Sequence, residues 1–220
     1  MAGRLVMAAQ LPAPRGLLLD AMGTLIGLRE PVGRTYASLA AAHGLSLDPQ
    51  RIERGFRAAY GQAPPLAFPG LAGAELRQAE LAWWSERIRS SLAAAGAESL
   101  PDPLGAALFN HYADAAAWQV YADVACLLPR WHERGLKLAV VSNFDSRLPG
   151  LLEQLGLGRW LSAVVVSSSA GAAKPDPAPF RVALELLQLD AHQVWHVGDS
   201  AEDVAGATAA GLPCIQVRRP

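Results

Sequence analysis

Five short apolar segments constrain the fold of this 220-residue chain more than any other feature of its sequence. Each is a continuous apolar run rather than an alternation of apolar and polar residues, as expected for strands that are covered on both faces. They span residues 16–19, 136–141, 163–166, 194–197 and 213–217. A helical pattern precedes the second segment (123–134), and others separate the later ones (148–155, 177–187 and 201–210). Strands that alternate with helices predict a parallel α/β sheet.

The region after the first segment breaks this alternation. No strand candidate follows Leu25 until about Leu136, and the residues between them have helical patterns. Asp48 and Pro49 predict a helix start, because aspartate suits the N-cap and proline the first helical position. A second long helix is predicted over 74–95. We therefore expect a helical insert, residues 28–115, in an α/β core formed by residues 1–27 and 116–220.

Composition narrows the function classes. Hydrophobic residues make up 51% of the chain and charged residues 18%, which predicts a large core and argues against disorder. A net charge of −1 argues against a nucleic-acid partner. No apolar run reaches the roughly 18 residues that a membrane span needs, and residues 1–16 resemble a loose leader more than a signal peptide. The only cysteines, Cys126 and Cys214, are expected to be packed thiols of a cytoplasmic protein.

Polar residues follow the carboxyl ends of the expected strands, where parallel sheets bind ligands. They are Asp20 after the first strand, Ser142 and Asn143 after the second, Asp199 and Asp203 after the fourth, and Lys174 ahead of the helix at 177–187. Carboxylates suit Mg²⁺, and an ammonium group and a hydroxyl suit phosphate oxygens. A carboxylate beside a cation can also act as a nucleophile. Each residue alone could be a loop or capping residue, but together they predict a phosphate site.

The motifs that contain these residues resemble, in order and spacing, the haloacid dehalogenase superfamily of hydrolases. LLLDAMGTL (17–25) matches the first motif, VVSN (140–143) the second, the lysine of AKPDP (173–177) the third, and VGDSAEDVAGA (197–207) the fourth. The resemblance extends from about residue 16 to 217. It implies a Rossmann-like α/β core with an inserted helical cap (cap type C1, subfamily IA). Trp83-Trp84, Trp118-Gln119-Val120 and SNFDSRL (142–148) resemble a subgroup related to an insect rhythmically expressed gene product.

The resemblance implies a magnesium-dependent site. Asp20 would be both nucleophile and metal ligand, and Thr24 would help to orient it. The backbone carbonyl of Met22 and the carboxylate of Asp199 would also bind Mg²⁺, and Asp203 would support the metal site. 

The resemblance also implies a phosphate-binding set opposite the metal. Ser142 would hydrogen-bond the transferring phosphoryl group, with Asn143 next to it in the second motif. Lys174 would neutralise charge on that group and hold Asp20 in place. The implied substrate is a small phosphorylated metabolite.

Met22 departs from the family pattern. Phosphatases of the family usually carry a second aspartate at this position, which protonates the leaving group and then activates water. Methionine can do neither, and acid–base catalysis is typically worth about 10²–10⁴-fold. Three hypotheses follow. The protein is a phosphatase that acts on substrates with good leaving groups or uses another acid, a weakly active or non-catalytic phosphate-binding homologue, or a 2-haloacid dehalogenase. The intact Gly198-Asp199 pair favours a metal and therefore a phosphate.

Several further residues have structural interpretations. Asp145 and Arg147 could face the crevice or cap the helix that follows them, and we favour capping. We expect His196 to be a satisfied core histidine. Three tryptophans are expected to pack in the core or between cap and core rather than to form a substrate platform; they are Trp83, Trp84 and Trp118.

Overall fold

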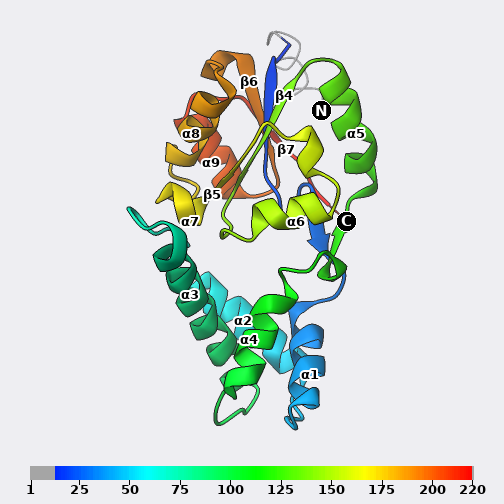
Figure 1. The fold of residues 1–220 in the computed structure, drawn as a ribbon, viewed down its shortest axis with the longest axis vertical. Coiled ribbons are helices and arrows are strands. Elements are labelled where there is room, and N and C mark those ends of the chain that lie inside the picture. The colour runs from blue at the N-terminus through cyan, green and yellow to red at the C-terminus, as the bar shows by residue number, and fades with distance from the viewer. Residues whose placement is uncertain (1–12, 220) are drawn as a thin grey trace, which may run out of the picture.

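The computed structural model describes residues 13–219 (Figure 1). Its core is a parallel five-stranded sheet in the order β5-β4-β1-β6-β7. The strands are β1 (Gly16–Leu19), β4 (Lys137–Ser142), β5 (Ala163–Val166), β6 (Val194–Gly198) and β7 (Cys214–Gln216). The predicted α/β class is thus confirmed, and each predicted strand agrees with an observed one to within a residue at either end. Residues 1–12 of the predicted leader lie outside the described range.

Helices cover both faces of the sheet, which explains why its strands are continuous apolar runs. On one face lie α5 (Ala122–Glu133) and α6 (Leu148–Gln154), and on the other α8 (Ala178–Leu187) and α9 (Ala201–Ala209). Successive side chains of β1 alternate between these two layers: Leu17 and Leu19 join the first, and Leu18 joins the second. Shorter elements complete the core, namely α7 (Ser167–Ala170), η2 (Ala115–Ala117), η3 (Gly158–Trp160) and η4 (Ala191–Gln193).

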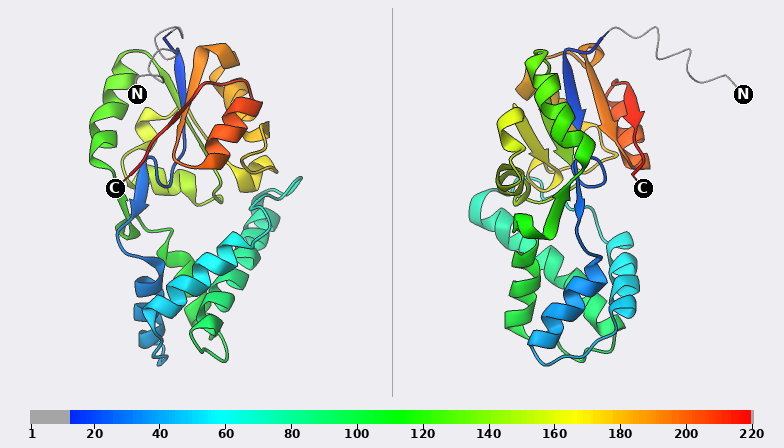
Figure 2. Two further views of the ribbon diagram at one scale, coloured as in Figure 1. Left: turned by 180° about the vertical axis from the view of Figure 1, so that it is seen from behind. Right: turned by 90° about the vertical axis from the view of Figure 1, so that its right-hand side faces the viewer.

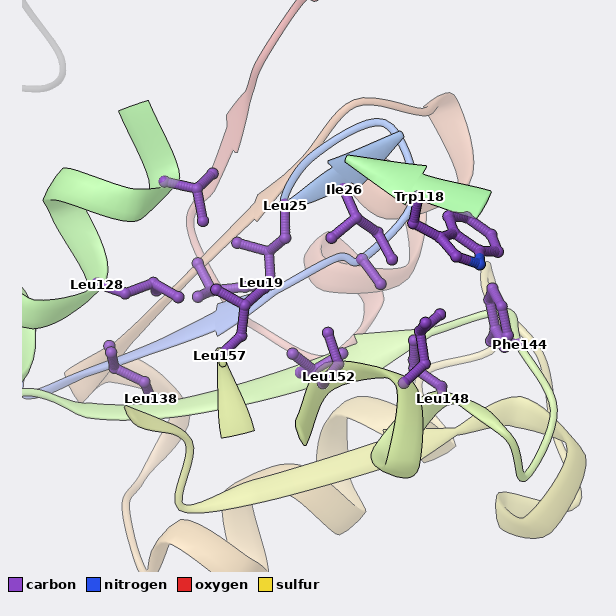
Figure 3. Packing of buried hydrophobic residues seen from close by; sticks show 14 of the residues in the cluster. Leu19, Leu25, Ile26, Trp118, Leu128, Leu138, Phe144, Leu148, Leu152 and Leu157 are labelled. Atoms are coloured by element: carbon purple, nitrogen blue, oxygen red, sulfur yellow. The ribbon is translucent and has the colours of Figure 1, made fainter. Parts of the chain in front are cut away.

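A two-stranded antiparallel ribbon joins the core to the other helices. It pairs β2 (Ile26–Leu28) with β3 (Trp118–Val120). The expectation of no strand between Leu25 and Leu136 is therefore wrong. Each strand is too short to show a periodicity, and its partner is distant in the sequence. The ribbon is held on the core by an apolar cluster in which Ile26 and Trp118 continue the layer under α5 and α6 (Figure 3).

The remaining helices form a separate body below the sheet in Figure 1, and Figure 2 shows it from two other sides. They are α1 (Val32–Ala42), α2 (Pro49–Gly61), α3 (Gly73–Ala94) and α4 (Asp102–His111). Asp48 accepts hydrogen bonds from the N–H groups of Gln50 and Arg51, at 2.7 and 2.9 Å, so the predicted N-cap is confirmed. These helices bury their own apolar cluster. Residues 28–115 remain the proposed cap: residue 28 ends β2, and residue 115 begins η2, which leads directly into β3.

Two further observations concern the whole described chain. Cys126 is exposed, Cys214 is half-buried, and both are free thiols. Within residues 13–219, none of the helices combines the length and the apolar character that a membrane span requires.

Candidate active site

A cavity of about 610 Å³ lies between the carboxyl edge of the sheet and the cap. The predicted site residues that line it are Asp20, Met22, Ser142, Asn143, Lys174, Asp199 and Asp203. Thr24 is buried beside it and is absent from the lining. The strand ends and the Lys174 loop thus place the predicted polar groups together, as the parallel topology implies.

Lys174 is the centre of the charged cluster. Its ammonium group lies 2.6 Å from Oδ1 of Asp20 and 2.6 Å from Oδ1 of Asp203, and it donates to the carbonyl of Val141 at 3.1 Å. Burial alone lowers the pKa of Lys174, but the two carboxylates outweigh it and raise the pKa above its ordinary value of 10.5. Lys174 is therefore a charged, buried cation with fixed partners.

Asn143 lines the cavity, and its side-chain amide also binds the backbone of Lys174. Its Oδ1 accepts the Lys174 N–H at 2.7 Å, and its Nδ2 donates to the Lys174 carbonyl at 3.0 Å. This amide clamp ties the end of β4 to the loop ahead of α8. Asn143, predicted among the catalytic residues, is thus placed where it positions Lys174.

Asp203 has donors on both carboxylate oxygens. Oδ1 accepts from Lys174 and lies 2.8 Å from Nε2 of His196, and Oδ2 accepts from the N–H and hydroxyl of Ser200 at 3.1 and 2.6 Å. Burial alone raises the pKa of Asp203, but the hydrogen bond from His196 and the charge of Lys174 hold it well below its ordinary value of 3.8. With 1% of its surface exposed, Asp203 is a fixed anion that supports its neighbours.

His196 is fully buried, and its ring meets Phe180 edge to face. Nε2 faces Asp203, whereas Nδ1 has no hydrogen-bond partner among residues 13–219. The expected core histidine is therefore satisfied at one nitrogen, through which it also holds Asp203.

The carboxylates of Asp20, Asp199 and Asp203 each offer an oxygen, and these atoms lie within 4.8 Å of one another. Among the described residues, hydrogen bonds reach Oδ1 of Asp20 and of Asp199, which leaves Oδ2 of each available. Burial raises the pKa of Asp20; Lys174 opposes that effect, and the nearby Asp203 and Asp199 add to it. A hard divalent cation suits this all-oxygen set and would relieve the repulsion among the carboxylates.

Thr24 contacts a different carboxylate from the expected one. Its hydroxyl donates to Oδ1 of Asp199 at 3.2 Å, so this contact orients Asp199 rather than Asp20. Gly23, at φ 85°, lies so close that a Cβ atom there would overlap the Asp199 carboxylate. The turn after β1 therefore fixes Asp199 as well as Asp20.

Met22 lines the cavity, and 48% of its surface is exposed. One further carboxylate belongs to the lining outside the cluster, the exposed Glu202 on α9. Neither Ser200 nor Asp176 adds a free polar group: Ser200 is the N-cap of α9, and exposed Asp176 accepts the Ala178 N–H at 2.8 Å.

Residues 145–147, after β4, join the core to the cap. Asp145 is fully buried and accepts the indole N–H of Trp84 at 2.7 Å, together with three N–H groups of Arg147 at 2.7–3.0 Å. Arg147 donates to the carbonyl of Phe109 and lies over its ring, 3.8 Å from the centroid. The expected capping is seen for Asp145, which accepts the N–H of Arg147 at the start of α6, whereas the Arg147 side chain makes no capping hydrogen bond. Arg147 lines the cavity instead, and both residues also contact the cap.

Glu80, on α3, adds a second cap–core contact that the sequence reasoning missed. It is 1% exposed and accepts the N–H of Ser146 at 2.8 Å and its hydroxyl at 2.5 Å. One signal was present: Glu80 falls between Leu76 and Trp84 at spacing four on the apolar face of a predicted helix. A carboxylate there needs a buried partner.

The three tryptophans take two different positions. Trp84 and Trp118 line the cavity, whereas Trp83 is buried and donates to the carbonyl of Pro64 at 3.0 Å. The expected packing is confirmed, because Trp118 belongs to the core cluster and Trp84 bonds Asp145 between cap and core. Trp84 and Trp118 also form part of the cavity wall.

The fold and the charged cluster at its carboxyl edge are those of a haloacid dehalogenase-like hydrolase. The model of that family matches residues 14–211, and the chain belongs to it. Haloacid dehalogenase-like hydrolase domain-containing protein 3 of Homo sapiens is 38% identical over 212 residues, which cover 94% of this chain and 82% of the human protein. A phosphoglycolate phosphatase of Rhodospirillum rubrum is 31% identical over 207 residues, 92% of this chain and 78% of that protein.

The expected resemblance to the rhythmically expressed subgroup is also confirmed. The rhythmically expressed gene 2 protein of Drosophila melanogaster is 29% identical over 197 residues, 84% of this chain and 75% of that protein. Solved structures share the fold at lower identity. L-2-haloacid dehalogenase from Xanthobacter autotrophicus superposes with a TM-score of 0.67 at 23% identity, covering 93% of this chain and 77% of that one.

Proposed function

We propose that this protein is a Mg²⁺-dependent phosphatase that acts on a small phosphorylated metabolite with a good leaving group, through an aspartyl phosphate on Asp20. The observation that carries the proposal is the position of the Lys174 ammonium group, 2.6 Å from both Asp20 and Asp203. The cation holds one oxygen of Asp20 and leaves the other available. Phosphatases among the relatives support the same reaction class.

The residues around the cavity have different roles in the proposed reaction. Asp20 attacks phosphorus through one carboxylate oxygen, and the bond from phosphorus to the leaving oxygen breaks. Lys174 and the hydroxyl of Ser142 face the phosphoryl oxygens, where fixed positive and hydrogen-bonding groups stabilise developing charge. Mg²⁺, held by Asp20, Asp199 and the carbonyl of Met22, would add a further positive charge at this position.

Met22 supplies neither an acid nor a base for the proposed reaction. With no acid at that position, the leaving oxygen departs with its electron pair and takes a proton from solvent. Water must then attack the aspartyl phosphate without help from a base at residue 22. We therefore propose that the first step is fast for good leaving groups and that the second step limits turnover.

The proposal also includes a cap over the active site and a cytoplasmic location. Residues 28–115 act as the cap, since the β2–β3 ribbon separates them from the sheet and Glu80 and Trp84 dock them on the core. A cytoplasmic location suits the free thiols of Cys126 and Cys214.

A weakly active phosphate-binding homologue is the second candidate, and Met22 is the observation that favours it. A dehalogenase would also lack an acid at this position, but it needs no metal. The cluster of Asp20, Asp199 and Asp203 gives a cation a site, which favours phosphate chemistry.

The test is hydrolysis of p-nitrophenyl phosphate by the purified protein with Mg²⁺ and with a chelator. We expect Mg²⁺-dependent release of p-nitrophenol that Asp20→Asn abolishes. Asp176→Asn is the matched control, because it removes an exposed carboxylate outside the cavity. Phosphate binding without turnover across a broad panel would favour the second candidate, and metal-independent halide release from 2-chloropropionate would favour a dehalogenase.

A further inference from the structure

We infer that the substrate's leaving group is an uncharged aromatic alcohol, bound in the cap portion of the cavity, so that the substrate is an aryl phosphate monoester. The inference rests on the proposed function and adds the substrate class. It depends on the size of the cavity, on the side chain at residue 22 and on the lack of a free cation among the described residues that line the cap portion.

The cavity extends well beyond the charged cluster. Its volume of about 610 Å³ lies within the range typical of sites for drug-sized ligands, about 300–1,000 Å³. The cap side is lined by aliphatic and aromatic side chains, among them Val32, Phe56, Tyr60, Ile88 and Leu108. A phosphate group at Asp20 and Lys174 leaves most of this space for the rest of the substrate.

Aromatic rings form one wall of the cap portion. Tyr60 stacks on Phe56, with ring centroids 5.8 Å apart, and on Trp84, with ring centroids 6.3 Å apart. All three rings line the cavity, and 45% of the surface of Tyr60 is exposed. These rings make part of the wall aromatic and polarisable, and a further ring can pack against it edge to face or offset.

The charges in the lining exclude an anionic leaving group. Apart from Lys174, the only cation among the described residues that line the cavity is Arg147. Its Nε and Nη2 groups bind Asp145, and its Nη1 group binds the carbonyl of Phe109, so its charge is already matched. A substrate carboxylate or second phosphate would have no free cation there, and a buried unpaired anion is strongly unfavourable.

Met22 favours the same substrate for an independent, chemical reason. An aryl oxygen carries negative charge more readily than an alkyl oxygen, so the bond from phosphorus to that oxygen breaks without an acid. The phosphoryl group moves to Asp20, the electron pair stays on the aryl oxygen, and water supplies the proton. The apolar side chain of Met22 also belongs to the lining.

The test compares 2-naphthyl phosphate, 2-phosphoglycolate and inorganic phosphate as ligands of the Asp20→Asn protein, by calorimetry. We expect 2-naphthyl phosphate to bind at least about tenfold more tightly than either of the others, a difference well within what one buried ring system supplies. Tyr60→Ala in this background should weaken 2-naphthyl phosphate about tenfold and leave inorganic phosphate unchanged. Tyr60→Phe should restore binding, and Phe68→Ala, a half-buried cap residue outside the lining, is the control.

The outcomes separate the two proposals. Tighter binding of 2-phosphoglycolate, or an equal effect of Tyr60→Ala on all three ligands, would overturn the aromatic leaving group. Hydrolysis of aliphatic phosphates in preference to 2-naphthyl phosphate by the unmodified protein would also overturn it, while the phosphatase activity stood. Selective binding of 2-naphthyl phosphate through Tyr60, without any Mg²⁺-dependent turnover, would support the pocket and overturn the phosphatase.

Discussion

The ammonium group of Lys174 lies 2.6 Å from the carboxylate of Asp20, and both groups are almost completely buried. The contact joins the end of β1 to the loop ahead of α8, across 154 positions of the sequence. In the proposed reaction the charge of Lys174 has two effects, because it holds Asp20 in place and stabilises the charge on the phosphoryl group.

Lys174→Met should lower kcat for p-nitrophenyl phosphate by about 10²–10³-fold, the usual effect of removing one fixed group that stabilises developing charge. It should also lower the free energy of unfolding by about 3 kcal/mol, because Asp20 and Asp203 lose their shared cation. Lys137→Met is the matched control, since Lys137 donates to the carbonyl of Leu187 and does not line the cavity. Equal effects of the two substitutions would contradict this role.

Met22→Asp should restore an acid and base beside Asp20. We expect steady-state turnover of an alkyl phosphate to rise about 10²-fold, within the range of acid–base catalysis, and the preference for good leaving groups to fall. Met22→Asn is the control, because asparagine has nearly the same shape as aspartate and cannot transfer a proton. No gain in Met22→Asp, together with loss of activity in Glu202→Gln, would show that Glu202 already serves as the acid.

Asp203 should contribute stability that depends on pH. Its folded pKa lies below 3.8, so as the pH falls the unfolded chain takes up the proton first. The stabilisation is therefore complete above 3.8 and is lost as the pH falls below that value. Urea unfolding of the wild type and Asp203→Asn should show a difference at neutral pH that shrinks on acidification. A difference that is constant with pH would show that the carboxylate's charge is not what stabilises the fold.

The Trp84–Asp145 hydrogen bond should hold the cap on the core. Trp84→Phe keeps a ring but leaves the buried Asp145 carboxylate without one donor, which costs about 1.5–3 kcal/mol. We expect faster hydrogen exchange at the cap–core contacts and a higher KM. Trp83→Phe is the control, because Trp83 bonds Pro64 within the cap. If both substitutions changed KM alike, the Asp145 contact would have no particular role in closure.

The sheet and the charged cluster could be predicted from sequence because their signals are local. Each strand is an apolar run, and Asp20, Asn143 and Asp199 follow strand ends that a parallel sheet brings to one edge. The β2–β3 ribbon could not be predicted from the sequence. Its three-residue strands are too short to show a hydrophobic periodicity, and they pair over a long distance in the sequence. The spacing of Glu80 places it on an apolar helix face, but its partner Ser146, like the Trp84 partner of Asp145, is known only once the cap is placed against the core. The first motif predicts that Thr24 lies near the carboxylates of the site. Which carboxylate its hydroxyl binds depends on the turn at Gly23.

The covalent state of Asp20 during turnover tests the account most directly. The protein would be mixed with p-nitrophenyl phosphate and Mg²⁺, and the reaction would be quenched in acid. The protein would then be digested and the masses of its peptides measured by mass spectrometry. Because residue 22 supplies no base, we predict that one phosphoryl group accumulates on Asp20 and that Asp20→Asn carries none. Release of p-nitrophenol without any phosphorylated peptide, or the same phosphorylated peptide from Asp20→Asn, would contradict the account.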